Sequence, residues 1–351
     1  MESPDMRKSS HPRRIFSAIG FFAVLLGAFA GPAARADTLD ATRARGYVTC
    51  GVNIGLAGFG LPDNSGVWRG FDIDTCRAVA AAIFDDPDKV RYIPLSSKDR
   101  FTALQSGEVD LLSHNTTWTE SREVGQGLLF TAINFYDGQG FLVRKSLGIS
   151  SALKLDGASV CVQQGTTNEL NLADFFRSHR LKMEPVVFAT ADEAIRAYDS
   201  GRCDAFSTDA SGLYAERLKL AHPDENVVLK ETISKEPFSP AVRQGDDRWF
   251  NLVKWTQFAL VDAEELGVTS KNVEEMKKSP NPEIRRLLGV EGDYGAGLGL
   301  TPDWAARILK AVGNYGEIFD RNLGKDSALK IPRGLNASWR DGGLLYAPPV
   351  R

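Results

Sequence analysis

The apolar residues of the chain follow two spacings, and the change from one to the other occurs twice in the same way. Helical spacing over residues 101–104 ends at Gly107, and residues 109–112 then have the pattern of a short strand. Helical spacing over residues 194–198 ends at Gly201, and a strand follows again. The two stretches read L-Q-S-G-E-V-D and Y-D-S-G-R-C-D, and both glycines fit the left-handed position just past a helix end.

This internal repeat places a polar residue at the same point in each half of the chain. Counting five residues on from Asp110 reaches Asn115, and counting five on from Asp204 reaches Asp209. Both positions come just past the end of a strand of the parallel type, which is where open α/β sheets bind their ligands. The repeat therefore predicts that Asn115 and Asp209 face a common ligand.

The stretch around the first of these positions reads D-L-L-S-H-N-T-T-W-T-E-S-R-E over residues 110–123. Thr117 or Thr119 can cap a helix that carries Arg122. A guanidinium offers two parallel N–H donors that match a carboxylate, and hydroxyls and free helix N–H groups can complete the shell. Taken alone, the stretch also fits an ordinary strand-to-helix turn with Arg122 on a solvated face. With Asp209 supplying an anion from the other half, the ligand should carry a carboxylate and an amine.

Other segments repeat the alternation of strand and helix, which predicts an α/β fold. The first strand is followed by a glycine-rich turn and a hairpin over residues 62–70, and Asp74 or Thr75 can cap the next helix. The predicted strands are 47–53, 160–164, 185–188 and 204–207, and the predicted helices are 76–84, 192–200 and a longer one beyond residue 247.

Residues 1–36 have the composition of an export signal. The apolar run 15–30 follows a positively charged start, and Ala34 and Ala36 supply the small residues that favour cleavage before Asp37. An uncleaved anchor is the alternative, although the apolar run is short for a membrane span. No cysteine follows the apolar run directly, so a lipid anchor is not expected. No later stretch is apolar over about 18 residues, so the mature protein should be soluble. The positively charged start of the expected export signal consists of Arg7, Lys8, Arg13 and Arg14.

Composition excludes several classes of function. The 351 residues carry a net charge of −3 with no basic run interleaved with aromatics, so nucleic acid is not an expected partner. Nucleotide-binding loops, the esterase G-x-S-x-G motif and the zincin H-E-x-x-H motif are missing from the sequence. The histidines beyond the expected export signal, His114, His179 and His222, are scattered, and the cysteines lack C-x-x-C spacing. We therefore expect no cofactor and no bound metal.

Several segments together resemble those of one family. S-H-N-T-T-W-T-E-S-R, V-Q-Q-G-T-T-N-E and S-T-D-A-S resemble the ligand-contact segments of bacterial periplasmic amino-acid-binding proteins, solute-binding family 3, which serve ABC importers. The similarity to the general L-amino-acid-binding branch extends over nearly all of the mature chain. It is carried by C-G-V-N-I-G-L-A-G-F, W-R-G-F-D-I-D-T-C-R-A-V-A, Y-D-G-Q-G-F, I-S-K-E-P-F-S-P and G-N-Y-G-E-I-F-D-R-N.

The resemblance implies a fold, a function and a place in the cell. The fold would be the two-lobed, clamshell fold of type II periplasmic binding proteins, with two hinge crossings that allow closure. The protein would be a periplasmic monomer that captures free L-amino acids of broad specificity. It would deliver them to the permease subunits of an ABC transporter in the inner membrane.

The resemblance also assigns roles to individual residues. Arg122 with Thr117 and Asn115 would hold the ligand carboxylate from the first lobe. Thr167 and Thr166, at a helix N-terminus, would meet that carboxylate from the second lobe, and Asp209 would take the ammonium. Asn53, at the end of the first strand, would lie near the ligand and form a neutral subsite. Without the resemblance, Asn53 could equally be a turn residue, and the two threonines a simple N-cap.

Domain bounds follow from the same comparison. Lobe one would comprise residues 37–138 and a return segment, 235–270, and lobe two would comprise residues 139–234. Residues 271–351 would form a helical extension packed on lobe one, with helical patches over 274–278, 302–310 and 318–322. We expect its aromatic residues to be buried against lobe one, namely Trp304, Tyr315, Phe319, Trp339 and Tyr346.

The four cysteines allow three pairings. Pairs within each lobe, Cys50 with Cys76 and Cys161 with Cys203, fit the symmetry of the two halves best. An exported protein permits such bonds. Four buried thiols are the alternative, because a disulfide needs Cα atoms within about 7 Å.

Two other classes of function compete with a binding protein. Some proteins of this fold are periplasmic dehydratases acting on cyclohexadienyl acids, which need a carboxylic acid poised over the leaving group. A sensor domain is the third class, but no membrane span or signalling module follows the lobes. We expect a binding protein and no enzymatic activity.

Overall fold

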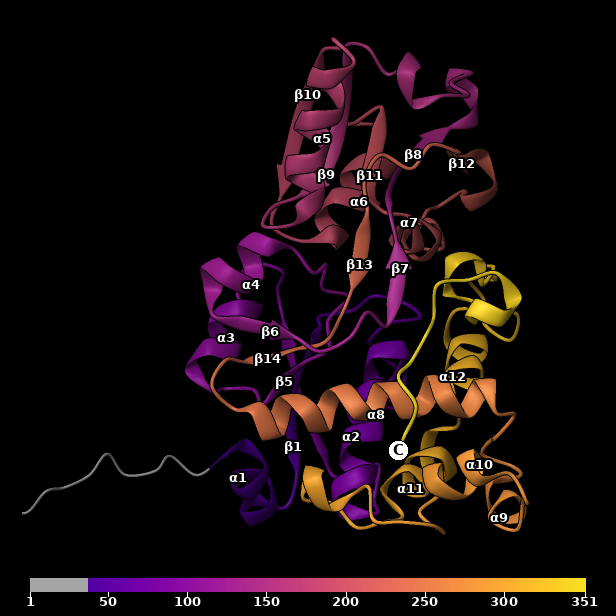
Figure 1. The fold of residues 1–351 in the computed structure, drawn as a ribbon. Helices are drawn as coiled ribbons and strands as arrows, with labels where there is room; N and C mark the ends of the chain where they lie inside the picture. The colour runs from indigo at the N-terminus through magenta and orange to yellow at the C-terminus, as the bar shows by residue number, and fades with distance from the viewer. Residues whose placement is uncertain (1–36) are drawn as a thin grey trace, which may run out of the picture. The chain divides into compact units, whose positions relative to one another are not determined.

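The computed structural model describes residues 37–351, which contain two five-stranded sheets (Figure 1). The export signal expected over residues 1–36 lies outside the described residues. We call each sheet with the helices around it a lobe, in the order of the chain. Among residues 37–351, no helix is both long enough and apolar enough to span a bilayer.

The first lobe has the strand order β4-β1-β5-β14-β6. β1 pairs in parallel with β4 and β5, whereas β14 arrives from much later in the chain and pairs antiparallel with β5 and β6. The carboxyl ends of three parallel strands therefore meet at one edge of the sheet. The strands are β1 (Val48–Asn53), β4 (Val90–Leu95), β5 (Leu111–Leu112), β6 (Leu128–Phe130) and β14 (Ala241–Arg243), with a hairpin of β2 (Leu61–Pro62) and β3 (Trp68–Arg69). The helices are α1 (Thr38–Arg45), α2 (Phe71–Phe84), α3 (Arg100–Ser106), α4 (Glu120–Gln126) and α8 (Asp247–Glu265).

The second lobe has the strand order β10-β9-β11-β8-β12. β9 pairs in parallel with β10 and β11, and β8 pairs antiparallel with β11 and β12. Its strands are β8 (Gln139–Arg144), β9 (Ala158–Gln163), β10 (Met183–Phe188), β11 (Ala205–Asp209) and β12 (Asn226–Val228). Its helices are α5 (Thr167–Ser178), α6 (Ala191–Asp199) and α7 (Ala210–Arg217).

Two short strands connect the lobes. β7 (Phe135–Asp137) leads out of the first lobe, β13 (Glu236–Phe238) leads back, and the two pair antiparallel (Figure 1). Phe135 lies opposite Phe238, and Asp137 lies opposite Glu236. The two crossings therefore form a common two-stranded hinge.

The C-terminal part of the chain packs on the first lobe. It contains α9 (Val273–Met276), α10 (Pro282–Leu287), α11 (Trp304–Val312) and α12 (Tyr315–Asn322), and α11 and α12 pack against α2 and α8. Its buried residues belong to the same core cluster as α2 and β1. Trp304, Tyr315 and Phe319 are buried as expected. The expectation is wrong for Trp339 and Tyr346, which are 45% and 69% exposed and contact each other edge to face.

The predicted start of one first-lobe helix is wrong. The helix expected over residues 76–84 begins at Phe71, so Asp74 and Thr75 are not caps but buried residues within α2. Asp74 accepts a hydrogen bond of 2.8 Å from Arg321 Nη2 of α12. A polar residue that resembles a helix start is thus satisfied by a partner more than 200 residues away, which local sequence does not reveal.

The repeated helix-end signals are confirmed. Gly107 directly follows α3 and has a φ of 83°, in the left-handed region. Gly201 follows the C-cap residue of α6 and has a φ of 85°, in the same region. Of the two candidate caps for the helix carrying Arg122, Thr119 is the one that acts, because its side chain accepts from the N–H of Arg122. These local features depend on backbone conformations that glycine and threonine favour, so sequence predicts them well.

Both disulfides lie within a lobe. Cys50 in β1 is bonded to Cys76 in α2, with Cα atoms 6.3 Å apart. Cys161 in β9 is bonded to Cys203, just before β11, with Cα atoms 5.7 Å apart. This is the pairing that the symmetry of the two halves favoured, and each bond ties a strand of a central sheet to the segment packed beside it.

Candidate functional site

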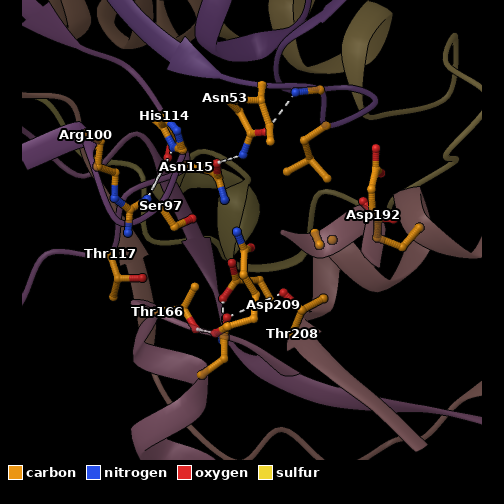
Figure 2. A pocket seen from close by; sticks show the side chains of 18 of the residues that line it. Asn53, Ser97, Arg100, His114, Asn115, Thr117, Thr166, Asp192, Thr208 and Asp209 are labelled. Atoms are coloured by element: carbon orange, nitrogen blue, oxygen red, sulfur yellow. Dashed lines mark hydrogen bonds between the residues drawn. The ribbon is translucent and has the colours of Figure 1, made fainter. Parts of the chain in front are cut away.

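A polar pocket lies between the two lobes, at the carboxyl ends of their parallel strands. Its empty volume is about 690 Å³, counting the part that opens to solvent. Figure 2 shows side chains from both lobes around it. Six of the seven predicted ligand-binding residues line it, namely Asn53, Asn115, Thr117, Thr166, Thr167 and Asp209. Arg122 is the exception, because it is not among the residues that line the pocket.

Two asparagines of the first lobe support one another. Asn53 Nδ2, at the end of β1, donates to Asn115 Oδ1 at 3.0 Å, and Asn53 Oδ1 accepts from the N–H of Gly55 (Figure 2). Asn115 has a φ of 38°, a left-handed conformation that asparagine tolerates better than most residues. Its N–H donates to Asp72 Oδ2 of α2 at 2.8 Å. The amide groups are therefore held in fixed positions at the pocket wall.

Arg100, which sequence reasoning did not select, lines the pocket and has no anionic partner in the described part of the chain. It is 3% exposed, and its Nη1 donates to the carbonyl of His114 and to His114 Nδ1, each at 3.3 Å. His114 Nε2 donates to the carbonyl of Leu95 at 2.8 Å, so Nδ1 must be the accepting nitrogen of a neutral ring. Burial lowers the pKa of His114 to about 3 and lowers the pKa of Arg100 well below its usual value. Arg100 is thus a buried cation next to neutral groups.

Arg122 supplies a second buried guanidinium on the same lobe. It is 7% exposed, and its Nη1 donates to the carbonyl of Thr117 at 2.8 Å. Its guanidinium carbon lies 5.2 Å from the ring centre of Phe101, and that of Arg100 lies 4.9 Å from the same ring. Burial lowers the pKa of Arg122, and nearby carboxylates partly oppose that shift. Within residues 37–351, neither guanidinium has a carboxylate oxygen within 4 Å.

Glu236, on the returning hinge strand, accepts hydrogen bonds from both lobes. Its Oε2 accepts from Thr117 Oγ1 of the first lobe at 2.6 Å and from Thr167 Oγ1 of the second at 2.8 Å. Its Oε1 accepts from Asn171 Nδ2 and Ser234 Oγ, both at 2.6 Å. A hydroxyl has one hydrogen to donate, so Thr117 and Thr167 can offer a ligand only the lone pairs of their hydroxyl oxygens.

The N-terminus of α5 supplies donors from the second lobe. Thr166 is at the N-cap position, but its hydroxyl donates to the carbonyl of Gln163 at 2.7 Å and does not cap the helix. The backbone N–H groups of Thr167 and Asn168 make no hydrogen bond with any other part of residues 37–351. Free N–H groups at the start of a helix bind anions.

Asp209, at the end of β11, is a buried carboxylate with no cationic partner among residues 37–351. Its Oδ1 accepts from Asn168 Nδ2 at 2.9 Å. Burial first, and then the neighbouring carboxylates of Glu236 and Asp137, raise the pKa of Asp209 well above its usual value. Burial also raises the pKa of Asp137 to about 6. This part of the pocket therefore favours a cation.

Two of the residues that sequence reasoning missed had recognisable signals. Arg100 begins α3 shortly after β4, so the strand-end rule that selected Asn115 applies to it as well. Glu236 is the only charged residue in the short strand β13. Among residues 37–351, no group of three His, Cys, Asp or Glu side chains is placed to hold a metal ion.

Comparison with known proteins gives a consistent result. The family of bacterial extracellular solute-binding proteins, family 3, matches residues 48–273. A general L-amino-acid-binding periplasmic protein of Rhizobium johnstonii is 59% identical over 337 residues, covering 95% of this chain and 98% of the relative. A glutamate/glutamine/aspartate/asparagine-binding protein of Rhodobacter capsulatus is 53% identical over 332 residues, covering 94% and 98%.

A similar protein has been solved with a ligand. The structure of a periplasmic binding protein of an ABC transporter from Brucella ovis, with glutathione bound, has 60% sequence identity and a TM-score of 0.89. The match covers 90% of this chain and 100% of that one.

Proposed function

The chain belongs to the bacterial extracellular solute-binding proteins of family 3, and we propose that it captures a free L-amino acid between its lobes for an ABC importer. The observation that carries the proposal is the charge arrangement of the pocket. Among residues 37–351, Arg100 and Arg122 on the first lobe have no anionic partner, and Asp209 on the second has no cationic one. A zwitterion supplies both missing partners, and buried charges need such partners.

The ligand carboxylate is assigned to donors from both lobes. Arg122 and the amide of Asn115 approach from the first lobe, and the free N–H groups at the start of α5 approach from the second. The hydroxyl of Thr166 is already engaged, so its contribution comes from placing the start of α5. Binding the carboxylate therefore joins the two lobes.

The ligand ammonium is assigned to Asp209, with the hydroxyl oxygens of Thr117 and Thr167 as further acceptors. Both hydroxyls point their hydrogens at Glu236, which leaves only lone pairs for the ligand. This differs from the role expected from the resemblance, in which these hydroxyls contact the carboxylate. The anionic surroundings of Asp209 support the assignment.

Arg100, with Asn53 nearby, is assigned to the ligand side chain. A guanidinium can donate to a carboxylate or to an amide oxygen, so acidic side chains and their amides would bind best. Ligands with other side chains would keep the contacts to the carboxylate and ammonium, which gives broad specificity. The Rhodobacter capsulatus relative is named for binding glutamate, glutamine, aspartate and asparagine, which agrees with this assignment.

Glutathione is a second candidate ligand. It carries one ammonium and two carboxylates. The pocket offers the carboxylate of Asp209 and the guanidinium of Arg100, and the guanidinium of Arg122 is buried on the same lobe. The Brucella ovis structure with glutathione bound supports including it among the ligands to be tested.

The remaining assignments concern the whole protein. Lobe one comprises residues 37–138 and 235–270, lobe two comprises 139–234, and 271–351 form the extension packed on lobe one. Residues 1–36 direct the chain to the periplasm and are removed, and the mature monomer docks on its permease. The relatives named above are binding proteins of transporters, which disfavours the alternative of a dehydratase.

Calorimetric titration of the mature protein with the twenty L-amino acids and glutathione tests the function. We expect glutamate, aspartate, glutamine and asparagine to bind most tightly, with weaker binding by most others. Binding by no amino acid and not by glutathione would refute the proposal. Turnover of prephenate or arogenate would restore the enzyme alternative.

A further inference from the structure

A second cavity, separate from the pocket between the lobes, lies within the first lobe. It is bounded by the segment 131–136, by α8 and α12, and by Leu345 and Tyr346 near the end of the chain. Figure 1 shows the last residues, in yellow, crossing α8. The cavity volume is about 290 Å³. A cavity of about 150 Å³ already holds a benzene ring, so this one has room for a substituted ring.

The lining of the cavity carries no charged side chain. Aromatic and aliphatic groups dominate, including Phe71, Trp118 and Ile318. A charged ligand would lose its hydration without gaining an opposite charge. The cavity therefore selects a neutral molecule, in contrast to the pocket between the lobes.

One polar group in the lining has no partner. Gln257 of α8 is 5% exposed, and its Oε1 lies 3.4 Å from Thr131 Oγ1, whose single hydrogen also faces the carbonyl of Pro240 at 3.3 Å. Its Nε2 makes no hydrogen bond within residues 37–351. A buried donor without an acceptor is rare in native proteins. An acceptor atom on a molecule in the cavity would satisfy it.

The C-terminal extension builds and holds this cavity. Tyr315 of α12 donates from its hydroxyl to the carbonyl of Asn134 at 2.8 Å. Asn336 accepts from the N–H of Tyr136 at 2.7 Å and donates to its carbonyl at 3.0 Å, as a neighbouring strand would. The extension thus fixes the segment that leads into the hinge strand β7 and forms one wall of the cavity.

We propose that this cavity is a second ligand site, which takes a neutral molecule of about one ring with a hydrogen-bond acceptor such as a carboxamide carbonyl. Gln257 Nε2 donates to the acceptor, and the apolar lining encloses the ring. The site is independent of the amino-acid pocket, because no residue lines both cavities.

Benzamide is the probe that tests this site, with toluene and benzoate for comparison. Saturation-transfer NMR and calorimetry on the mature protein should show benzamide binding at millimolar concentration, toluene more weakly and benzoate not at all. Saturating glutamate should leave benzamide bound. Failure of benzamide to bind, or its displacement by glutamate, would overturn the proposal whether or not glutamate itself binds.

Two variants locate the probe. Gln257→Met keeps the length of the side chain but removes the donor, so the preference for benzamide over toluene should fall by about two- to tenfold. Ala132→Phe fills the cavity and should abolish binding of both, while glutamate still binds. If Ala132→Phe does not fold, as judged by circular dichroism, Val261→Phe replaces it. If Gln257→Met kept the same preference for benzamide over toluene, the probe would bind elsewhere. Benzamide binding by a folded Ala132→Phe or Val261→Phe variant would show the same.

Discussion

The two lobes reach the pocket by the same local construction and bring opposite charges to it. In each lobe a helix ends near a left-handed glycine, a parallel strand follows, and a polar side chain comes just past the strand end. The first lobe contributes two buried guanidiniums to this region, Arg100 from the start of α3 and Arg122 from α4, and the second lobe contributes Asp209 from the end of β11. The repeated backbone determines where the side chains lie, and the identity of the side chains determines the chemistry. In the proposed function, the ligand supplies the charges that each lobe lacks.

The lobes also differ in how their cores are built. The first lobe shares its larger core cluster with the C-terminal extension, through α2, α8 and α11, and has a second, smaller cluster around α3. The second lobe has two smaller clusters, one on each side of its sheet. The second lobe should therefore depend more on its disulfide for stability.

The largest expected effect comes from removing the charge of the second lobe. Asp209→Asn keeps the size of the side chain and leaves a ligand ammonium without its counter-charge, which should cost about 2–5 kcal/mol of binding free energy. Calorimetry with glutamate and glutamine measures the loss. Analogues that lack the amine serve as the control, because their weak binding should change little or improve. Equal affinity for amino acids in variant and parent would make Asp209 a structural carboxylate.

Removing the disulfide of the second lobe should have a comparable effect on stability. The double change Cys161→Ala and Cys203→Ala should lower the free energy of unfolding by about 2–4 kcal/mol. Scanning calorimetry should then show the second lobe melting ahead of the first. The matched change Cys50→Ala and Cys76→Ala should keep a single transition, because the core around that bond is shared with the extension. In the parent protein, the unreduced mass should be four hydrogens below the reduced mass, and free thiols at full stoichiometry would contradict both bonds.

Removing Arg100 should separate ligands by their side chains. Arg100→Met keeps much of the apolar stem but loses the guanidinium, so glutamate should lose about 1.5–3 kcal/mol of binding free energy. Alanine, which does not reach Arg100 in the proposed arrangement, should bind as in the parent. An equal loss of binding free energy for glutamate and alanine would indicate that Arg100 contacts the α-carboxylate and not the side chain of the ligand.

A smaller loss is expected when Arg122 is replaced by lysine. Arg122→Lys keeps the positive charge but loses the forked donor, so all amino acids should bind weaker by at least ~1.4 kcal/mol, a tenfold change. The titrations used above measure this loss. Unchanged affinity would show that Arg122 does not bind the ligand, and Arg100 would then be the ligand-binding cation of the first lobe.

The pH dependence of binding should reflect the charge of the second lobe. The raised pKa of Asp209 means that the empty pocket holds this carboxyl partly protonated at low pH. An ammonium needs the ionised form, so affinity for glutamine should rise with pH until the carboxyl is fully ionised, by at most about tenfold per pH unit. Titrations between weakly acidic and weakly basic pH, in buffers of different ionisation enthalpy, should show proton release on binding. Asp209→Asn should flatten the profile, and an equally steep profile in the variant would assign the titration to another group.

Sequence reasoning succeeded where local pattern is sufficient. The left-handed glycines and the Thr119 cap each depend on a few neighbouring residues. The strand-end pattern also selected Asn115 and Asp209, which line the pocket and whose contact with a ligand stays a prediction. It failed for the start of α2 and for the exposure of Trp339 and Tyr346. In those cases the outcome depended on distant partners or on where the end of the chain packs.

The sequence by itself determined the alternation of strand and helix, the internal repeat and the two polar strand ends, because short-range backbone preferences and side-chain periodicity carry that information. Only the tertiary structure decided which charges are left without partners. It brought Glu236 to Thr117 and Thr167, so that their hydroxyls present lone pairs, and it buried Arg100 beside a neutral histidine. Burial and hydrogen-bond direction depend on residues far apart in the chain, and they set the chemistry that each side chain offers a ligand.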